Sequence, residues 1–189
     1  MAALNIKKGS SSHSAYDLRD PNADVVETHT LAVLVDNEAG VLARVIGLFS
    51  GRGYNIDSLT VAAVDPVRNL SRINLVTSGT DMVIEQIKAQ LDRLVQVHRV
   101  ADLAKQGPHV ARELALIKVV CKGAERVEAL RLAEAFRARV IDATLESFVF
   151  EMTGNTDKLD AFIELMRGLG LAEVSRTGVA AIARGTATI

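Results

Sequence analysis

The spacing of apolar residues along the chain changes in an order that restricts the possible folds. Between residues 29 and 103 an apolar run is followed by helical spacing, two strand-like segments, a second helical segment and a last apolar run. A change in apolar period from two to 3.6 residues predicts a change from strand to helix. The order strand–helix–strand–strand–helix–strand predicts a ferredoxin-like unit, with two helices on one face of a four-stranded sheet.

The same order of spacings returns after residue 110. The predicted strands are 29–35, 55–64, 70–77 and 95–103 in the first half, and 114–121, 140–145, 148–152, 171–174 and 179–182 in the second. The predicted helices are 40–50, 80–94, 127–136 and 159–166. We therefore expect an α+β chain of two tandem ferredoxin-like βαββαβ domains.

Local signals predict the ends and faces of these helices. Thr80 or Asp81 can cap the second helix, because both side chains can accept a hydrogen bond from a free backbone N–H. Thr156 or Asp157 can cap the last helix in the same way. The third helix is expected to bury one apolar stripe. That stripe is Val127, Leu130, Ala133 and Phe136.

These patterns divide the chain into four parts. Residues 28–104 are expected to form the first domain and residues 111–189 the second. A linker is expected at 105–110, where Gly107 and Pro108 interrupt the periodicity. Residues 1–27 have no apolar core of the kind that a secretory signal needs, so we expect a flexible extension.

Composition argues against several classes of function. With 22 Lys+Arg against 23 Asp+Glu, the chain lacks the basic surplus of a general nucleic-acid binder. Aromatic residues make up 4%, too few for the stacking platforms on which single-stranded nucleic acid is bound. No apolar run approaches the length of a membrane span. Cys121 is the only cysteine, expected as a buried thiol, which fits a reducing cytoplasm.

The segment Asp36 to Leu42 is the first candidate binding site. It joins a predicted strand to a helix that opens at Gly40. The first backbone N–H groups of a helix lack internal partners and favour an anion such as a carboxylate. Gly40 lets a ligand approach closely, and Asn37 offers both a donor and an acceptor. The pattern alone favours an ordinary tight turn and helix start over a binding site.

The segment Arg52 to Ile56 is the second candidate. Gly53 ends the preceding helix, and Asn55 stands at the start of the next strand. Asn55 could line the wall of a pocket for a small ligand, or simply belong to a helix-to-strand turn.

Catalytic and metal-binding patterns are poorly supported. The four histidines are His13, His29, His98 and His109. They lack the spacing of metal ligands, and His98 is expected to be a surface residue on a strand. No phosphate-binding loop, nucleophile elbow or dinucleotide-binding glycine motif follows a predicted strand. We therefore expect neither an enzyme nor a metal site in this chain.

A longer run of residues resembles a known family. Residues 36–42 (Asp-Asn-Glu-Ala-Gly-Val-Leu) alone are similar to the ACT domain, an amino-acid-sensing module. Residues 44–50 (Arg-Val-Ile-Gly-Leu-Phe-Ser) and 52–56 (Arg-Gly-Tyr-Asn-Ile) are more specific. They resemble the small regulatory subunit of acetohydroxyacid synthase, also called acetolactate synthase. The likeness extends over nearly all of residues 30–184.

The resemblance implies a regulatory subunit without an active site. Thiamine diphosphate, magnesium and FAD are then expected on a separate catalytic large subunit, which this chain would activate. It also implies feedback inhibition by valine in the biosynthesis of valine, leucine and isoleucine, with valine bound between the ACT domains of a homodimer or higher oligomer. By motif match, the site residues are Asn37, Ala39, Gly40, Val41 and Leu42 of one chain, with Asn55 and Ile56 of the other.

Three alternatives stay open at this point. The chain could be an ACT-type regulator of a different enzyme, an RNA-binding ferredoxin-like protein, or a small enzyme. The scarcity of aromatics weighs against the second, and the lack of an acid–base pair at a plausible spacing weighs against the third. The resemblance leaves open the selectivity among branched-chain amino acids, the oligomer size, the surface that contacts the catalytic subunit, and the role of the second domain.

Overall fold

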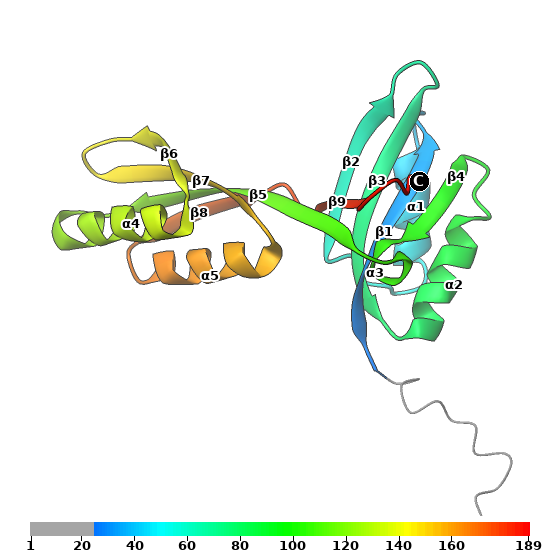
Figure 1. The fold of residues 1–189 in the computed structure, drawn as a ribbon, viewed down its shortest axis with the longest axis horizontal. Coiled ribbons are helices and arrows are strands. Elements are labelled where there is room, and N and C mark those ends of the chain that lie inside the picture. Colours follow the sequence, from blue (N-terminus) through cyan, green and yellow to red (C-terminus); the bar gives the residue numbers. More distant parts are fainter. Residues whose placement is uncertain (1–24) are drawn as a thin grey trace, which may run out of the picture.

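The computed structural model describes residues 25–189, which form two α/β units joined by one long strand (Figure 1). The strands of the first unit are β1 (Glu27–Asp36), β2 (Ser58–Asp65), β3 (Leu70–Gly79) and β4 (Val97–Asp102), and its helices are α1 (Val41–Ser50) and α2 (Asp81–Leu91). The sheet is antiparallel, in the order β2-β3-β1-β4. We call this unit the N-terminal domain.

The second unit repeats this arrangement. Its strands are β5 (His109–Val120), β6 (Arg139–Ala143), β7 (Ser147–Gly154) and β8 (Leu171–Arg176), and its helices are α4 (Gly123–Phe136) and α5 (Thr156–Arg167). The sheet order is β6-β7-β5-β8. Both predicted βαββαβ patterns, and with them the α+β fold class, are confirmed. We call this unit the C-terminal domain.

Each domain has its own core between its sheet and its two helices. In the N-terminal domain, alternate residues of β1 (Leu31, Val33 and Val35) pack against apolar residues of α1 and α2. In the C-terminal domain, Phe150 of β7 and Phe162 of α5 are fully buried with their ring centroids 6.0 Å apart. Strands with alternating apolar residues and helices with one apolar face therefore form the sheet and helix layers that the sequence predicted.

Two expectations about helices were wrong. Helix α4 buries Ala129 and Ala133, whereas Val127 and Leu130, expected on the buried stripe, are exposed. Small alanine side chains let the helix pack closely on the sheet, and its apolar pattern did not distinguish this stripe from its neighbour. Helix α5 is capped by Asn155, whose side chain accepts from the backbone N–H of Lys158, and not by Thr156 or Asp157. The cap at Thr80 of α2 was predicted correctly.

The region between the domains also differs from expectation. Residues 105–110 do not form an irregular linker: a short helix α3 (Leu103–Gln106) fills the first part, and β5 already begins at His109. Gly107, with φ of 123°, and Pro108 separate α3 from β5. At the N-terminus, Glu27 already belongs to β1, and residues 1–24 of the expected extension lie outside the described residues.

A last strand, β9 (Ala180–Ala183), returns from the C-terminal to the N-terminal domain (Figure 1). It pairs antiparallel with residues 109–112, the first part of β5. This ribbon covers the sheet face of the N-terminal domain that the helices leave open. The buried apolar residues of this third cluster are Ala32, Val76, Ala101, Leu103, Val179 and Ala181.

Replacing Gly170 with alanine is expected to destabilise the C-terminal domain by about 3 kcal/mol. Gly170 has φ of 93°, and an added Cβ would lie 2.2 Å from the backbone oxygen of Val120. The N–H of Val120 donates to the oxygen of Gly170 at 2.9 Å, so neither backbone can move away freely. Thermal unfolding followed by circular dichroism measures the effect.

Gly168 provides the matched control for this prediction. Its φ of −70° is helical, and its added Cβ would lie 3.7 Å from the nearest atom, the backbone oxygen of Leu165. Gly168→Ala should therefore leave stability unchanged or raise it slightly. Equal destabilisation by both substitutions would contradict the close approach at Gly170.

Candidate functional site

The loop between β1 and α1 presents an open helix N-terminus. Gly40 is the N-cap residue, with φ of 87° and ψ of −10°, and no side chain caps the helix. The described residues offer no backbone acceptor for the N–H groups of Leu42 and Ala43. An added Cβ on Gly40 would meet no atom within 4 Å, so the space above the loop is open. Free N–H groups and the positive end of the helix dipole suit a carboxylate.

The rest of this loop is held by its backbone. The N–H of Asn37 donates to the oxygen of Asn69 at 2.7 Å, and the side-chain amide of Asn69 donates back to the oxygen of Asn37 at 3.2 Å. Asn69 has φ of 53°, which asparagine tolerates better than most residues. Both bonds fix the loop without the exposed Asn37 side chain, which is therefore available to a ligand.

The start of α1 divides its apolar residues between the core and the surface. Val41 is only 4% exposed and packs with Val45 and Phe49, so it can offer a ligand its backbone but not its side chain. Leu42 and Ile46 are 36% and 38% exposed. They lie one turn apart on the same face of the helix. Sequence reasoning included Leu42 but missed Ile46, which the i, i+4 spacing could have indicated.

Asn55 and Ile56 lie beyond the other end of α1. The side-chain amide of Asn55 donates to Oδ1 of Asp57 at 2.5 Å, and its backbone oxygen accepts from Oγ1 of Thr77 at 2.6 Å. The Asn55 side chain is exposed and presents its remaining carbonyl oxygen, whereas Ile56 packs partly against the core.

Helix α1 separates the two predicted halves of the site within one chain. The helix has ten residues, which corresponds to about 15 Å of rise between the Gly40 loop and the segment at Asn55. An amino acid is too short to contact both ends at once. The structure therefore places the predicted residues in two groups and does not bring them together in a single chain.

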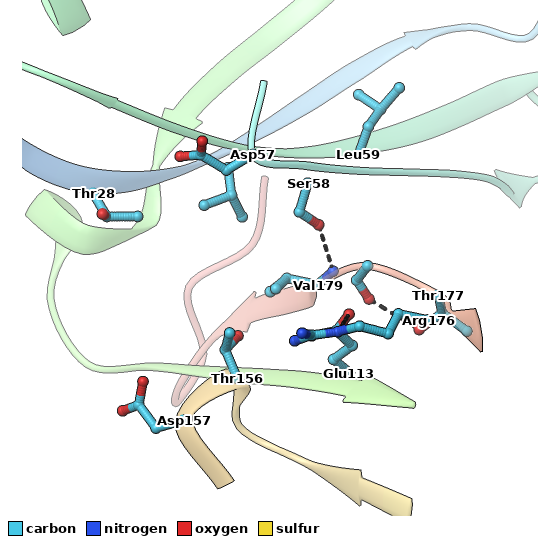
Figure 2. A pocket seen from close by; sticks show the side chains of 12 residues that line it. Thr28, Asp57, Ser58, Leu59, Glu113, Thr156, Asp157, Arg176, Thr177 and Val179 are labelled. Carbon is cyan, nitrogen blue, oxygen red and sulfur yellow. Dashed lines mark hydrogen bonds and ion pairs between the residues drawn. The ribbon is translucent and has the colours of Figure 1, made fainter. Parts of the chain in front are cut away.

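A cleft between the domains has no counterpart in the sequence predictions (Figure 2). Its volume is about 730 Å³, and residues from β2, β5, β8 and the start of α5 line it. On its wall, Arg176 donates to both carboxylate oxygens of buried Glu113, at 2.8 and 2.6 Å, and to Oδ1 of Asp160 at 2.6 Å. The hydrogen bonds with Glu113 raise the pKa of Arg176. Glu113 and Arg176 lie 63 residues apart, so no local pattern in the sequence predicts their contact.

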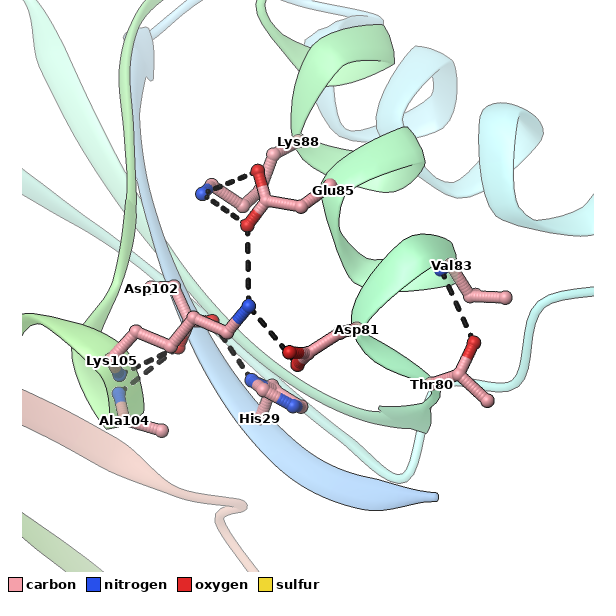
Figure 3. A network of polar contacts seen from close by, with 9 residues as sticks. All are labelled: His29, Thr80, Asp81, Val83, Glu85, Lys88, Asp102, Ala104 and Lys105. Atoms are coloured by element: carbon pink, nitrogen blue, oxygen red, sulfur yellow. Dashed lines mark hydrogen bonds and ion pairs between the residues drawn. The ribbon is translucent and has the colours of Figure 1, made fainter. Parts of the chain in front are cut away.

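A buried contact between a histidine and an aspartate joins the first and last strands of the N-terminal domain (Figure 3). Nδ1 of His29 lies 2.8 Å from Oδ2 of Asp102, and both side chains are 2% exposed. The other oxygen of Asp102 accepts from the backbone N–H groups of Ala104 and Lys105 and so caps α3. This geometry fits a structural role for Asp102, because both oxygens of its carboxylate are hydrogen-bonded and the side chain is shielded from solvent.

Lys105 and His98 occupy surface positions. The Lys105 ammonium binds Asp81 at 3.0 Å and Glu85 at 3.4 Å, and its pKa is raised, mainly by the hydrogen bond to Asp81 (Figure 3). His98 lies on β4 as expected, with Nε2 2.6 Å from Oδ1 of Asp36. His109 starts β5 instead of lying in a linker, and His13 lies outside the described residues.

Other classes of site are not visible in residues 25–189. Within that range no three His, Cys, Asp or Glu side chains are grouped as they would be around a metal ion. None of the helices described has the length and apolarity needed to cross a membrane. Cys121 is buried, as predicted, and burial raises the pKa of its thiol.

Comparison with known proteins agrees with this fold. Residues 31–99 match the family described as the ACT domain of acetohydroxyacid synthase small subunits, and residues 112–185 match the family described as the small subunit of acetolactate synthase. The fold and the open helix N-terminus thus belong to an ACT-domain protein with a second ferredoxin-like domain.

Individual relatives identify the family further. The chain is 46% identical over 157 residues to a probable acetolactate synthase small subunit of Archaeoglobus fulgidus, covering 83% of this chain and 97% of the relative. It is 48% identical to the isozyme 3 small subunit of Salmonella typhimurium, covering 82% and 94%. The crystal structure of the small subunit from Thermotoga maritima superposes with a TM-score of 0.77 at 37% identity, covering 85% and 99%. The chain belongs to the acetolactate synthase small-subunit family.

Proposed function

We propose that this chain is the non-catalytic regulatory subunit of an acetolactate synthase. It activates a separate catalytic subunit, which carries thiamine diphosphate, magnesium and FAD, and it confers feedback inhibition by valine on branched-chain amino-acid biosynthesis in the cytoplasm. Membership of this family supports the proposal that a catalytic subunit is the partner. The accessible helix start at Gly40 is the observation that carries the effector proposal.

The chemistry of the two groups of residues suits a free α-amino acid. The N–H groups at the start of α1 bind the carboxylate. The side-chain oxygens of Asn37 and Asn55 accept from the ammonium group. Leu42 and Ile56, with Ile46 in addition, provide apolar contacts for a short branched side chain, and Ala39 lets the ligand approach the loop.

The 15 Å spacing along α1 requires two chains to complete each site. In a homodimer whose ACT domains lie side by side, the Gly40 loop of one chain faces Asn55 and Ile56 of the other. A two-fold axis then produces two equivalent sites. The partly exposed Leu42 and Ile46 also contribute apolar surface to this interface.

Reconstitution tests the proposal. Mixing the full chain with its catalytic subunit should raise the rate of acetolactate formation, and added valine should lower that rate. The catalytic subunit alone, assayed with valine, is the control and should not respond. Leucine and isoleucine, tested in parallel, should inhibit less, because one methylene changes binding by about 1–3 kcal/mol.

Two outcomes would contradict the proposal in different ways. If mixing leaves the acetolactate rate unchanged, the alternative applies: an ACT-type regulator of a different enzyme. If the rate rises on mixing but valine neither inhibits nor binds in calorimetry, the chain is an activating subunit and the effector assignment is wrong.

A further inference from the structure

The segment that follows β8 is hydrogen-bonded to β2, an edge strand of the N-terminal domain. The N–H of Val179 donates to Oγ of Ser58 at 2.8 Å (Figure 2), and the oxygen of Val179 accepts from Oγ1 of Thr60 at 3.2 Å. One residue of the C-terminal domain thus binds two residues of β2 through its backbone. We call residues 178–181 the strap.

The strap is also packed against the N-terminal domain, and its C-terminal end is hydrogen-bonded to it. Arg72 of β3 donates to the backbone oxygen of Ala181 at 2.8 Å. The side chains of Val179 and Ala181 are buried against the sheet of the N-terminal domain, in the cluster that contains Ala32 and Val76. Burial lowers the pKa of Arg72, as expected for a guanidinium partly withdrawn from water.

Gly178 shows how closely the strap approaches β2. An added Cβ would lie 2.8 Å from Oγ of Ser58, 3.2 Å from Cγ2 of Thr60 and 3.3 Å from the backbone oxygen of Leu59. A side chain at this position would therefore require the Ser58 hydroxyl, which binds the Val179 N–H, to move, and Thr60 and Leu59 to shift slightly. Gly178 also has φ of 82°, which turns the chain from β8 towards β9.

The strap binds β2 next to the proposed effector wall. Asn55 bonds Asp57, whose other oxygen accepts from Oγ of Ser78, and Ser58 follows directly. Asn55 therefore lies three residues from Ser58, whose side chain holds Val179. On its N-terminal side the strap continues, through Thr177, into Arg176, which bonds buried Glu113 of β5 and Asp160 of α5.

We propose that the strap couples the effector site to the C-terminal domain, so that effector binding at Asn55 and the position of the C-terminal domain control each other through β2. This inference rests on the proposed function. Because coupling between two sites is reciprocal, loosening the strap weakens the effector response even though the strap does not contact the effector. Residues 178–181 thus act by positioning β2.

Gly178→Ala tests the coupling, with Gly185→Ala as its matched control. Gly185 has φ of 78°, and its added Cβ would meet nothing within 4 Å, so it carries the same backbone strain without the contact to β2. Gly178→Ala should raise the valine concentration for half-inhibition of the reconstituted enzyme about tenfold, a typical size for allosteric coupling. Activation without valine should be unchanged in both variants.

Deuterium exchange of the full chain distinguishes coupling from a merely structural role. In the wild type, valine should slow exchange both at residues 53–60 and at the strap. In Gly178→Ala it should slow exchange only at residues 53–60. A second pair uses side chains: Ser58→Ala removes the acceptor of the Val179 N–H and should behave like Gly178→Ala, whereas Ser175→Ala, at an exposed position of β8, should behave as wild type.

The outcomes separate this inference from the proposed function. If valine protects residues 53–60 but not the strap in the wild type, or if Gly178→Ala and Gly185→Ala respond alike to valine, the coupling is overturned and the effector site stands. If valine protects neither segment in the wild type, the proposed effector site itself is wrong.

Discussion

Replacing Gly40 with aspartate should abolish the response to valine while leaving activation of the catalytic subunit intact. The new carboxylate would stand at the helix start where the carboxylate of valine is proposed to bind. Two like charges about 4 Å apart repel by roughly 4 kcal/mol at an effective dielectric of about 20, so affinity should fall on the order of 100-fold or more. Calorimetric titration with valine measures the loss.

Folding should survive this substitution, because Gly40 has open space around it and aspartate tolerates a positive φ better than most residues. Gly40→Asn is the matched control, since it has the same shape without the charge. It should weaken valine binding much less. Equal losses of valine affinity in both variants would contradict binding of the valine carboxylate at this position. No loss in either variant would mean that valine binds elsewhere.

Mixed dimers test whether the site is shared between chains. In a dimer of one Gly40→Asp chain and one Asn55→Lys chain, whose new ammonium repels that of valine, one site combines both substitutions and the other combines the unchanged loop with the unchanged Asn55. Mixing two chains that each fail to bind valine should therefore restore one site per dimer. If both residues belong to the same site within one chain, mixing restores nothing.

The parts of the fold that the sequence predicted are those governed by local spacing. Alternation in β1 and the helical stripe of α5 determine which face is buried, because a strand or helix can bury only one face at a time. Helix α4 shows the limit of this argument. Alanines at 129 and 133 are buried because the sheet lies close to them, and spacing along the helix alone contains no information about that distance.

The helix start at Gly40 was predictable from the sequence, but the geometry around it was not. A strand, a polar turn and a glycine-opened helix indicated the anion-binding end of α1, and the structure adds that Val41 faces the core. Contacts between distant residues were missed. His29 with Asp102 and Ser58 with Val179 lie 73 and 121 residues apart, and no local pattern brings such pairs together.

Replacing Arg176 with methionine should lower the free energy of unfolding of the C-terminal domain by about 3–5 kcal/mol, because it leaves a buried carboxylate without its charged partner. Glu113 is 5% exposed, and the guanidinium donates to both of its oxygens. Methionine keeps most of the aliphatic length, so the loss reports the charge and its hydrogen bonds. Urea denaturation followed by circular dichroism, with exchange of β5 amides, measures it.

Two further variants show whether burial is the cause. Glu113→Gln in the Arg176→Met background removes the unpaired charge and should recover part of the lost stability. Arg167→Met breaks a surface pair with Glu164, in which both side chains are mostly exposed, and should cost less than about 1 kcal/mol. If Arg176→Met costs no more than Arg167→Met, Glu113 reaches water once its partner is gone. Apolar packing alone would then hold β5, α5 and β8 together beside the strap.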